Sequence, residues 1–345
     1  PAGPGGAAPA GRAGLTPHRK VHVNSAGPGP PGPFHFRTRS PESPSRPPAV
    51  HDYHAPAAAG LEPAVAEELR GLGLEVLGAA RGVVRFAGRA ADGVRAALAL
   101  RSAPRVVLEL ARDLPVEAEA LRDALGGVSW EDHLPSGVAW AARGIGTSDA
   151  LRDTRFNARL VKDAVRDRFR SKGRVCPPVD PRGALVLVEL RIDRGRATVG
   201  LDLGGGSLHA RGTARRGEAP LREDVAAGLA LLAGVRGVAE GGAPLLDPFC
   251  GTGTLIAEAA AIALRIAPRR DPAAMPLSRL PAFAGVDAKG IARELAAAPV
   301  PAHAPFLAFD RDPRAVREAR RALAVLVLAG HVTVAEAAVP AVPLP

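Results

Sequence analysis

Residues 245–259 read LLDPFCGTGTLIAEA, and this stretch decides the fold of the C-terminal part of the chain. A short apolar run ends in Asp247, a Gly-x-Gly turn follows, and an Ala-rich helical pattern begins near Thr254. A strand, a tight loop and a helix N-terminus in this order hold a nucleotide-like cofactor at the edge of a parallel sheet. Gly251 and Gly253 are expected to let the backbone approach a ligand where a Cβ atom would clash. The alternative for an isolated Asp247 is a strand-ending acid that caps the next turn.

A second acid is expected at the same edge of the sheet. Residues 305–309 predict a short strand, and Asp310 directly follows it. An acid in this place can accept hydrogen bonds from ribose hydroxyls. Asp312 is expected to cap the helix that begins at Pro313. A Pro-rich insertion within residues 267–304 separates this strand from the glycine loop.

The composition favours a partner that carries phosphate. The formal net charge is +10, and the chain has 41 Arg against 4 Lys. Guanidinium groups are always charged and bind phosphate oxygens bidentately, which suits RNA. A general compositional bias toward Ala, Arg, Gly and Pro accounts for part of the arginine excess. No apolar run approaches the roughly 18 residues of a membrane span, and no secretory signal is visible. A cytoplasmic protein without membrane contact is expected.

The two cysteines, Cys176 and Cys250, form neither a disulfide framework nor a metal cluster, so reduced thiols and no metal are expected. Cys250 lies in the glycine loop. A small packing residue is the preferred interpretation, because a nucleophile would need a nearby histidine partner.

The N-terminal half divides into three parts. Thirteen of the first 57 residues are proline, and residues 1–49 are expected to be a disordered basic tail. Over residues 50–111 the hydrophobic pattern predicts a β-α-β-β-α-β order, which is typical of a ferredoxin-like unit. Residues 112–203 predict a helix at 115–125, a strand at 138–142, an amphipathic helix at 156–169, and two strands at 184–190 and 197–203.

The amphipathic helix is the candidate RNA-binding element. Its apolar side is expected to carry Phe156, Leu160, Val165 and Phe169. Arginines and lysines on a helix face can follow a phosphate backbone, and the alternative is a solvated surface helix. The candidate RNA-binding residues are Arg155, Arg159, Lys162, Arg166, Arg170 and Lys172.

Residues 204–345 alternate between helical and strand patterns, which favours a parallel α/β sheet. Helices are expected at 221–232, 255–266, 290–298 and 314–328. Strands are expected at 245–246, 305–309 and 332–334. His209 and Glu223 precede this sheet and, taken alone, are more typical of surface residues than of catalytic ones.

Several separate segments together resemble the bacterial THUMP-domain RNA methyltransferases, in particular the large-subunit rRNA guanine-N2 methyltransferase group. They are Gly60-Leu61-Glu62 with Glu68-Leu69, Trp130-Glu131-Asp132, Val161 to Val165, Leu201-Asp202-Leu203, Ser207-Leu208-His209-x-Arg211-Gly212, Glu218 to Glu223, Asp247 to Thr254, and Asp310 to Arg314. The resemblance extends over residues 50–345. It implies an α/β protein with an α+β N-terminal half: a ferredoxin-like unit and a THUMP module, then a Rossmann-like methyltransferase domain at 204–345.

The resemblance also implies a reaction and a cofactor. The reaction is methylation of an exocyclic amine of a base in RNA, most specifically guanine N2 in rRNA, with S-adenosylmethionine as methyl donor. The implied cofactor-binding residues are Asp247, Pro248, Cys250, Gly251, Thr252, Gly253, Thr254 and Asp310.

The sequence departs from the family pattern in one respect. The family holds the base amine with an Asn/Asp-Pro-Pro-Tyr/Phe loop, and no such sequence occurs here, so no catalytic residue is assigned. Glu336 is the only candidate for the acid after the third strand. We therefore expect an incomplete methyltransferase sheet, impaired by itself. The alternatives are a non-catalytic RNA-binding protein and, last, an NAD-dependent enzyme, which is disfavoured because Ile256 occupies the third glycine position of the dinucleotide fingerprint.

Overall fold

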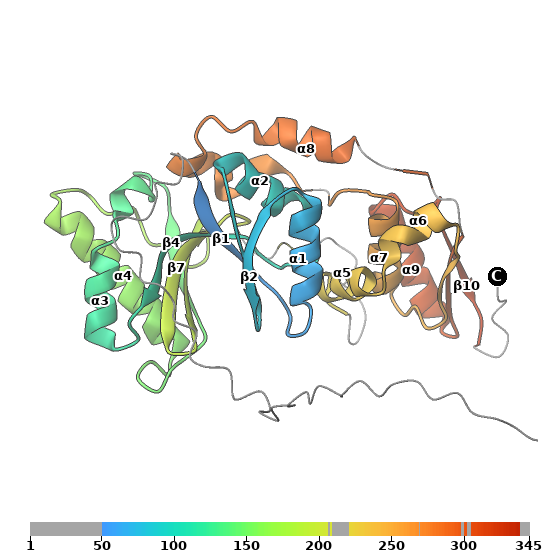
Figure 1. The fold of residues 1–345 in the computed structure, drawn as a ribbon, viewed down its shortest axis with the longest axis horizontal. Coiled ribbons are helices and arrows are strands. Elements are labelled where there is room, and N and C mark those ends of the chain that lie inside the picture. Colours follow the sequence, from blue (N-terminus) through green and yellow to red (C-terminus); the bar gives the residue numbers. More distant parts are fainter. Residues whose placement is uncertain are drawn as a thin grey trace, which may run out of the picture. The chain divides into compact units, whose positions relative to one another are not determined.

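The computed structural model describes residues 50–205, 208, 221–268, 270–297, 300–301 and 305–338 (Figure 1). The tail expected at residues 1–49 lies outside the described residues, as does most of the stretch from Ser207 to Pro220.

The N-terminal half forms one seven-stranded sheet. Its strands lie in the order β2-β3-β1-β4-β7-β6-β5. The strand bounds are β1 His51–Pro56, β2 Glu75–Ala80, β3 Val83–Gly88, β4 Val107–Leu114, β5 Trp140–Ile145, β6 Val186–Asp193 and β7 Arg196–Asp202. All pairs are antiparallel except β5 with β6.

The first four strands and two helices confirm the ferredoxin-like order. Helix α1 (Glu62–Gly71) follows β1, and α2 (Ala90–Ala99) follows β3. The core here includes Tyr53, which stacks on Phe86 with ring centroids 5.0 Å apart. A Cβ atom on Gly93 would lie 2.6 Å from the Tyr53 ring, so the close approach of α2 to β1 requires glycine at this position.

The second module continues the same sheet. Helix α3 (Ala118–Gly126) precedes β5, and helix α4 (Thr154–Ser171) follows it. The short 3₁₀ helix η1 (Trp130–Asp132) lies between α3 and β5. Strand β4 pairs with β1 on one side and with β7 on the other. The expected boundary between residues 111 and 112 therefore falls inside a strand that both modules share.

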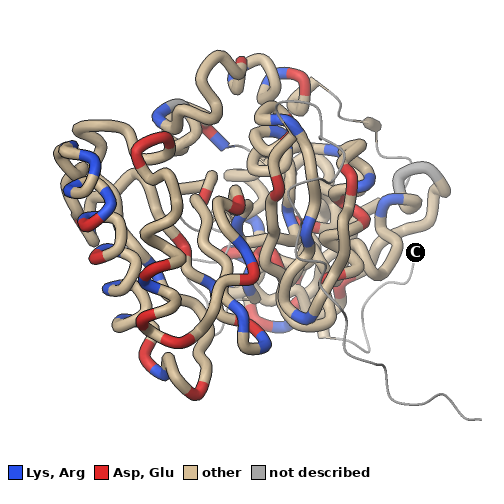
Figure 2. The backbone as a smooth tube through the Cα atoms, turned by 60° about the vertical axis from the view of Figure 1, so that its left-hand side comes forward, with Lys and Arg blue, Asp and Glu red and all other residues tan. Residues whose placement is uncertain are grey.

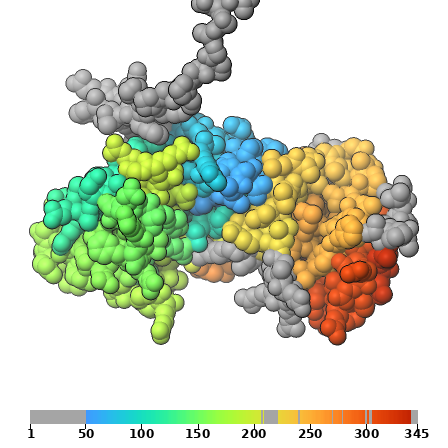
Figure 3. All heavy atoms as spheres, turned by 90° about the horizontal axis from the view of Figure 1, so that it is seen from below, coloured from blue at the N-terminus to red at the C-terminus, as the bar shows by residue number. Residues whose placement is uncertain are grey.

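The C-terminal part contains three parallel strands in the order β10-β9-β8. The bounds are α5 Glu223–Leu232, η2 Val235–Gly237, α6 Val238–Gly241, β8 Leu245–Asp247, α7 Thr254–Ala263, α8 Ala288–Ala296, β9 Phe306–Asp310, α9 Pro313–Val325 and β10 Val332–Glu336. Figure 3 shows the segment of β9, α9 and β10 in orange to red. Within the described part of the chain, β8 is an edge strand of this sheet.

The insertion after α7 packs on the N-terminal module. It forms three 3₁₀ helices, η3 (Pro272–Ala274), η4 (Pro276–Arg279) and η5 (Pro281–Phe283), before α8. Met275, Leu277, Leu280 and Phe283 are buried in the same hydrophobic cluster as Tyr53 and its neighbours. The composition alone did not predict this contribution to the N-terminal core.

Candidate cofactor site and basic helix

The glycine loop lies between the end of β8 and the start of α7. The Phe249 N–H donates to Asp247 Oδ1 at 3.2 Å, so the acid shapes the first turn of the loop. The Cys250 N–H donates to the Phe309 carbonyl of β9 at 2.8 Å, and the Gly253 N–H donates to the Cys250 carbonyl at 2.7 Å. The loop is thereby held against the neighbouring strand by backbone hydrogen bonds.

Asp310 ties this loop to β9 through its side chain. Its Oδ2 accepts from the Gly251 N–H at 2.9 Å, and its Oδ1 accepts from the Asp312 N–H at 2.9 Å. Asp312 in turn caps α9 by accepting from the Arg314 N–H, which confirms its predicted role as a helix cap, whereas the ligand role of Asp310 stays a prediction. Because β8 and β9 are parallel neighbours, Asp247 and Asp310 lie at the same edge of the sheet.

The environment of Asp247 raises the pKa of its carboxyl above the ordinary value. Burial of the side chain is the main cause, and the nearby negative charge of Asp310 adds to it. Two carboxyl groups are thus held close together at a half-buried position, where hydroxyl or amine groups of a ligand would donate hydrogen bonds to them.

The two loop glycines have different roles. Both have a positive φ, +52° for Gly251 and +80° for Gly253. A Cβ atom on Gly251 would meet nothing within 4 Å, whereas one on Gly253 would lie 2.9 Å from the Ala319 Cβ of α9. Only Gly251 therefore borders open space that a ligand could fill. Gly253 is needed for the packing of the loop on α9, and the expectation that both glycines make room for a ligand stays a prediction.

The third strand brings another acid to this edge. Glu336 is the last residue of β10 and pairs in register with Asp310. Its side chain is exposed. The described chain therefore places Asp247, Asp310 and Glu336 at the carboxyl ends of three adjacent parallel strands, in the position where open α/β sheets bind ligands.

The basic helix α4 has two halves of different character. In its C-terminal half the arginines form ion pairs with carboxylates: Arg166 with Asp163, Arg170 with Asp167, and Arg168 with Glu131 at 2.7 Å. In its N-terminal half Arg155, Arg159 and Lys162 have no carboxylate within ion-pair distance among the described residues. Figure 2 shows Lys and Arg in blue and Asp and Glu in red along the backbone.

One residue of this helix lies elsewhere than expected. Phe156, predicted on the apolar side, is 41% exposed, whereas Val165 and Phe169 are buried as predicted. Asn157 occupies the buried position in the first turn, because Gly144 of β5 leaves room for the close approach of the helix: a Cβ atom there would lie 3.1 Å from the Asn157 Cβ.

Two family models match the chain. An RlmL ferredoxin-like domain matches residues 52–107, and an RMKL-like methyltransferase domain matches residues 211–344. The chain belongs to this methyltransferase family.

Curated relatives agree with the two models. The ribosomal RNA large subunit methyltransferase K/L of Marinobacter nauticus is 35% identical over 292 residues, which is 82% of this chain and 40% of the relative. The protein of the same name from Pseudomonas aeruginosa PAO1 is 44% identical over 61% of this chain and 29% of its own length. The chain thus spans less than half the length of these relatives.

Solved structures share the fold. SMU.472, whose crystal structure is a complex with SAH, is 27% identical with a TM-score of 0.71, and the match covers 86% of this chain and 78% of that one. TrmN from Thermus thermophilus is 23% identical with a TM-score of 0.54, covering 84% of this chain and 73% of that one, and supports the fold alone.

The remaining loop residues of the methyltransferase domain are mostly buried or half-buried. Burial raises the pKa of the Cys250 thiol to about 12, which agrees with a packing role and disfavours a nucleophile. Thr254 is buried at the start of α7, and its hydroxyl lies 3.5 Å from that of Thr252. Pro248 is half-buried between Asp247 and Phe249. Sequence reasoning did not single out Phe249, whose side chain is 73% exposed beside the loop.

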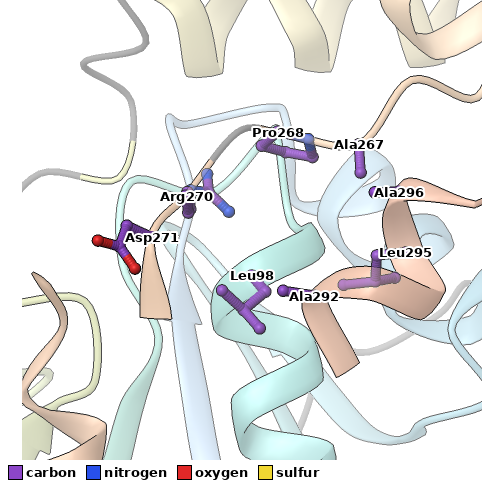
Figure 4. A pocket seen from close by; sticks show the side chains of 8 residues that line it. All are labelled: Leu98, Ala267, Pro268, Arg270, Asp271, Ala292, Leu295 and Ala296. Carbon is purple, nitrogen blue, oxygen red and sulfur yellow. The ribbon is translucent and has the colours of Figure 1, made fainter. Parts of the chain in front are cut away.

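Two hollows of the structure lie away from this loop. One, of about 390 Å³, is lined by Leu98, Ala267, Pro268, Arg270, Asp271, Ala292, Leu295 and Ala296 (Figure 4). The other, of about 570 Å³, lies beside it and shares Ala267, Pro268 and Leu295 with it. No residue from Asp247 to Thr254 lines either of them, so the assignment of the cofactor site depends on the loop and its acids. No described helix is long and apolar enough to cross a membrane.

Proposed function

We propose that the methyltransferase domain binds S-adenosylmethionine at the edge formed by β8, β9 and β10, and that the N-terminal module binds RNA. The observation that carries this proposal is the pair of acids at adjacent strand ends: Asp247 accepts from the Phe249 N–H and Asp310 accepts from the Gly251 N–H, with open space where a Gly251 Cβ would lie. The family match and the SAH complex of the related structure support the cofactor assignment.

The residues at this edge fit such a cofactor. Asp310 is placed to accept hydrogen bonds from the ribose hydroxyls, since each of its carboxylate oxygens accepts one backbone N–H among the described residues and has a lone pair left. Asp247 and the glycine loop would position the methionine part. When bound, the cofactor supplies an electrophilic methyl group. The protein's part is to align the acceptor with it and to exclude water, which needs geometry more than a strong base.

The names of the curated relatives support rRNA of the large subunit as the substrate. We infer that the target is an exocyclic amine, with guanine N2 as the specific proposal. The N-terminal module, residues 50–203, would supply most of the RNA contacts, with the candidate residues of α4 among them.

Isothermal titration with S-adenosylhomocysteine tests the cofactor site. Asp310→Asn and Asp247→Asn should each weaken binding by about tenfold or more, because each removes a charge-assisted hydrogen bond. Glu318→Gln, on α9, is the matched control and should bind as the parent chain does. Parent-like affinity in both Asp variants would contradict the proposed site.

A second candidate function is RNA binding without turnover. It is favoured by Arg155, Arg159 and Lys162 in the N-terminal half of α4, which form no ion pair with a carboxylate among the described residues. Transfer of a labelled methyl group to rRNA by the 345-residue chain would exclude this candidate.

A further inference from the structure

Helix α4 exposes one aromatic side chain amid its positive charges. Phe156 lies in its first turn and is 41% exposed, although the other large apolar residues of the helix, Leu160, Val161, Val165 and Phe169, are all less than 10% exposed. A single exposed apolar residue needs no explanation by itself. The residues around Phe156, however, indicate a function for its exposed side chain.

Two arginines flank Phe156 on the helix. Arg155 precedes it directly, and Arg159 follows it by three residues, about one turn and 5–6 Å away. Both are exposed. Within the part of the chain that the structure describes, neither forms an ion pair with a carboxylate. In this they differ from Arg166 and Arg170, which pair with aspartates.

An exposed ring near two guanidinium groups that form no ion pair among the described residues suits a single-stranded nucleic acid. The base has a flat face that stacks on an aromatic ring, and the adjoining phosphates are anions that the arginines can bind bidentately. A duplex offers the phosphates but keeps its bases stacked inside. A protein partner would need acidic groups around an apolar contact, which a self-association of this basic surface does not provide.

We propose that Phe156 is a stacking platform for an unpaired RNA base, with Arg155 and Arg159 on the phosphates beside it. This inference rests on the proposed RNA binding and deepens it, since it assigns a contact residue and favours single-stranded over duplex RNA. Nothing in the sequence pattern indicated this role, because helical periodicity had placed Phe156 in the core.

The test measures the affinity of the full 345-residue chain for fluorescent decauridine, decaadenosine and a 20-base-pair RNA duplex. Phe156→Ala should weaken binding of both single strands by about 5- to 150-fold and leave duplex binding nearly unchanged. Phe156→Trp should retain the affinity. Phe156→Leu should lose single-strand affinity as Phe156→Ala does, because a leucine side chain is apolar but has no flat face on which a base can stack.

The salt dependence separates stacking from charge. Phe156→Ala should leave the slope of log affinity against log salt unchanged, whereas Arg159→Gln should reduce it by about 0.7. Leu232→Ala, at a 50% exposed apolar residue of α5, is the control for loss of an exposed apolar side chain. Circular dichroism confirms that each variant is folded.

Four outcomes would overturn the inference. Parent-like single-strand affinity in Phe156→Ala would do so while RNA binding itself stands. Equal losses for single strands and duplex would show a general effect on the helix. A dimer of the parent chain that dissociates in Phe156→Ala, with RNA affinity unchanged, would make Phe156 a contact between copies. Absence of RNA binding by the parent chain would refute the inference together with the RNA part of the proposed function, and S-adenosylhomocysteine titration would still report on the cofactor part.

Discussion

Arg101 and Glu258 form a buried ion pair between the N-terminal module and helix α7, with 2.8 Å between Nη1 and Oε2. Arg101 follows α2, whereas Glu258 lies on the helix that begins at the glycine loop. The guanidinium also donates to the Ile266 carbonyl beyond the end of α7. The helix that follows the glycine loop is thereby fixed to the N-terminal module.

Loss of one partner of this pair should destabilise the protein strongly. Arg101→Met leaves the Glu258 carboxylate buried without its guanidinium, and we expect a loss of about 3–5 kcal/mol in the free energy of unfolding. The double variant Arg101→Met/Glu258→Met should regain part of that loss. Urea denaturation measures both.

The exposed pair Arg95–Glu294, at 2.7 Å, is the control. Because solvent screens it, Arg95→Ala should cost less than about 1 kcal/mol. If Arg101→Met cost no more than this control, the buried pair would have no special role.

The two loop glycines should separate stability from ligand binding. Gly253→Ala should lower the melting temperature, since its methyl group would lie 2.9 Å from the Ala319 Cβ. Gly251→Ala meets no neighbour and should cost only about 1 kcal/mol for its positive φ, yet it should weaken S-adenosylhomocysteine binding. Thermal unfolding and calorimetric titration of both variants measure the two effects, and equal binding losses at equal stability would refute the distinction.

Asp202 should make the stability depend on pH. Burial is the main cause that raises the pKa of this carboxyl from its ordinary value of 3.8 to about 7. Between pH 4 and 7 the unfolded chain releases the proton that the folded chain retains, so this group's contribution to stability falls as pH rises, with a slope of at most about 1.4 kcal/mol per pH unit. Asp202→Asn removes the effect.

The measurement is the difference in unfolding free energy between Asp202→Asn and the parent chain. This difference isolates Asp202, because His54, Glu109 and Glu189 titrate in both proteins. The asparagine variant should gain relative stability up to about pH 7 and remain constant above it. A difference that is flat with pH would show that Asp202 is ionised in the folded state, held by Arg105, whose Nε lies 3.5 Å from Oδ2.

The two thiols should differ in reactivity. Cys250 is buried with a pKa of about 12, whereas Cys176 is partly exposed with a smaller rise in pKa. Iodoacetamide at pH 8 should modify Cys176 first, because the thiolate is the reactive form. Mass spectrometry of the peptides follows the order of modification, and faster reaction at Cys250 would point to a reactive loop cysteine.

Most elements of the fold could be predicted because their apolar residues repeat at helical or strand spacing. The strand–loop–helix unit at Asp247 and the cap at Asp312 follow from local chemistry, and the structure confirms both. The pairing of β4 with β7 could not be predicted, since it joins strands that are far apart in the sequence and no local signal specifies it.

The errors at individual residues also have physical causes. Phe156 was placed in the core because periodicity alone cannot show that Asn157, opposite Gly144, takes the buried position. The packing of Gly253 on α9 could not be predicted either, because it depends on Ala319, a residue of a different helix. Such contacts arise only in the folded chain.

The strand β4, which pairs with β1 and with β7, also constrains how the protein can be synthesised. The ferredoxin-like strands are complete once residue 114 has left the ribosome, but the second edge of β4 has no partner until residue 202 follows. For that interval the nascent chain presents an open row of amide and carbonyl groups, which is a site for wrong pairing with other chains. A pause in translation before β7, or a chaperone that covers β4, would decide the yield of native protein.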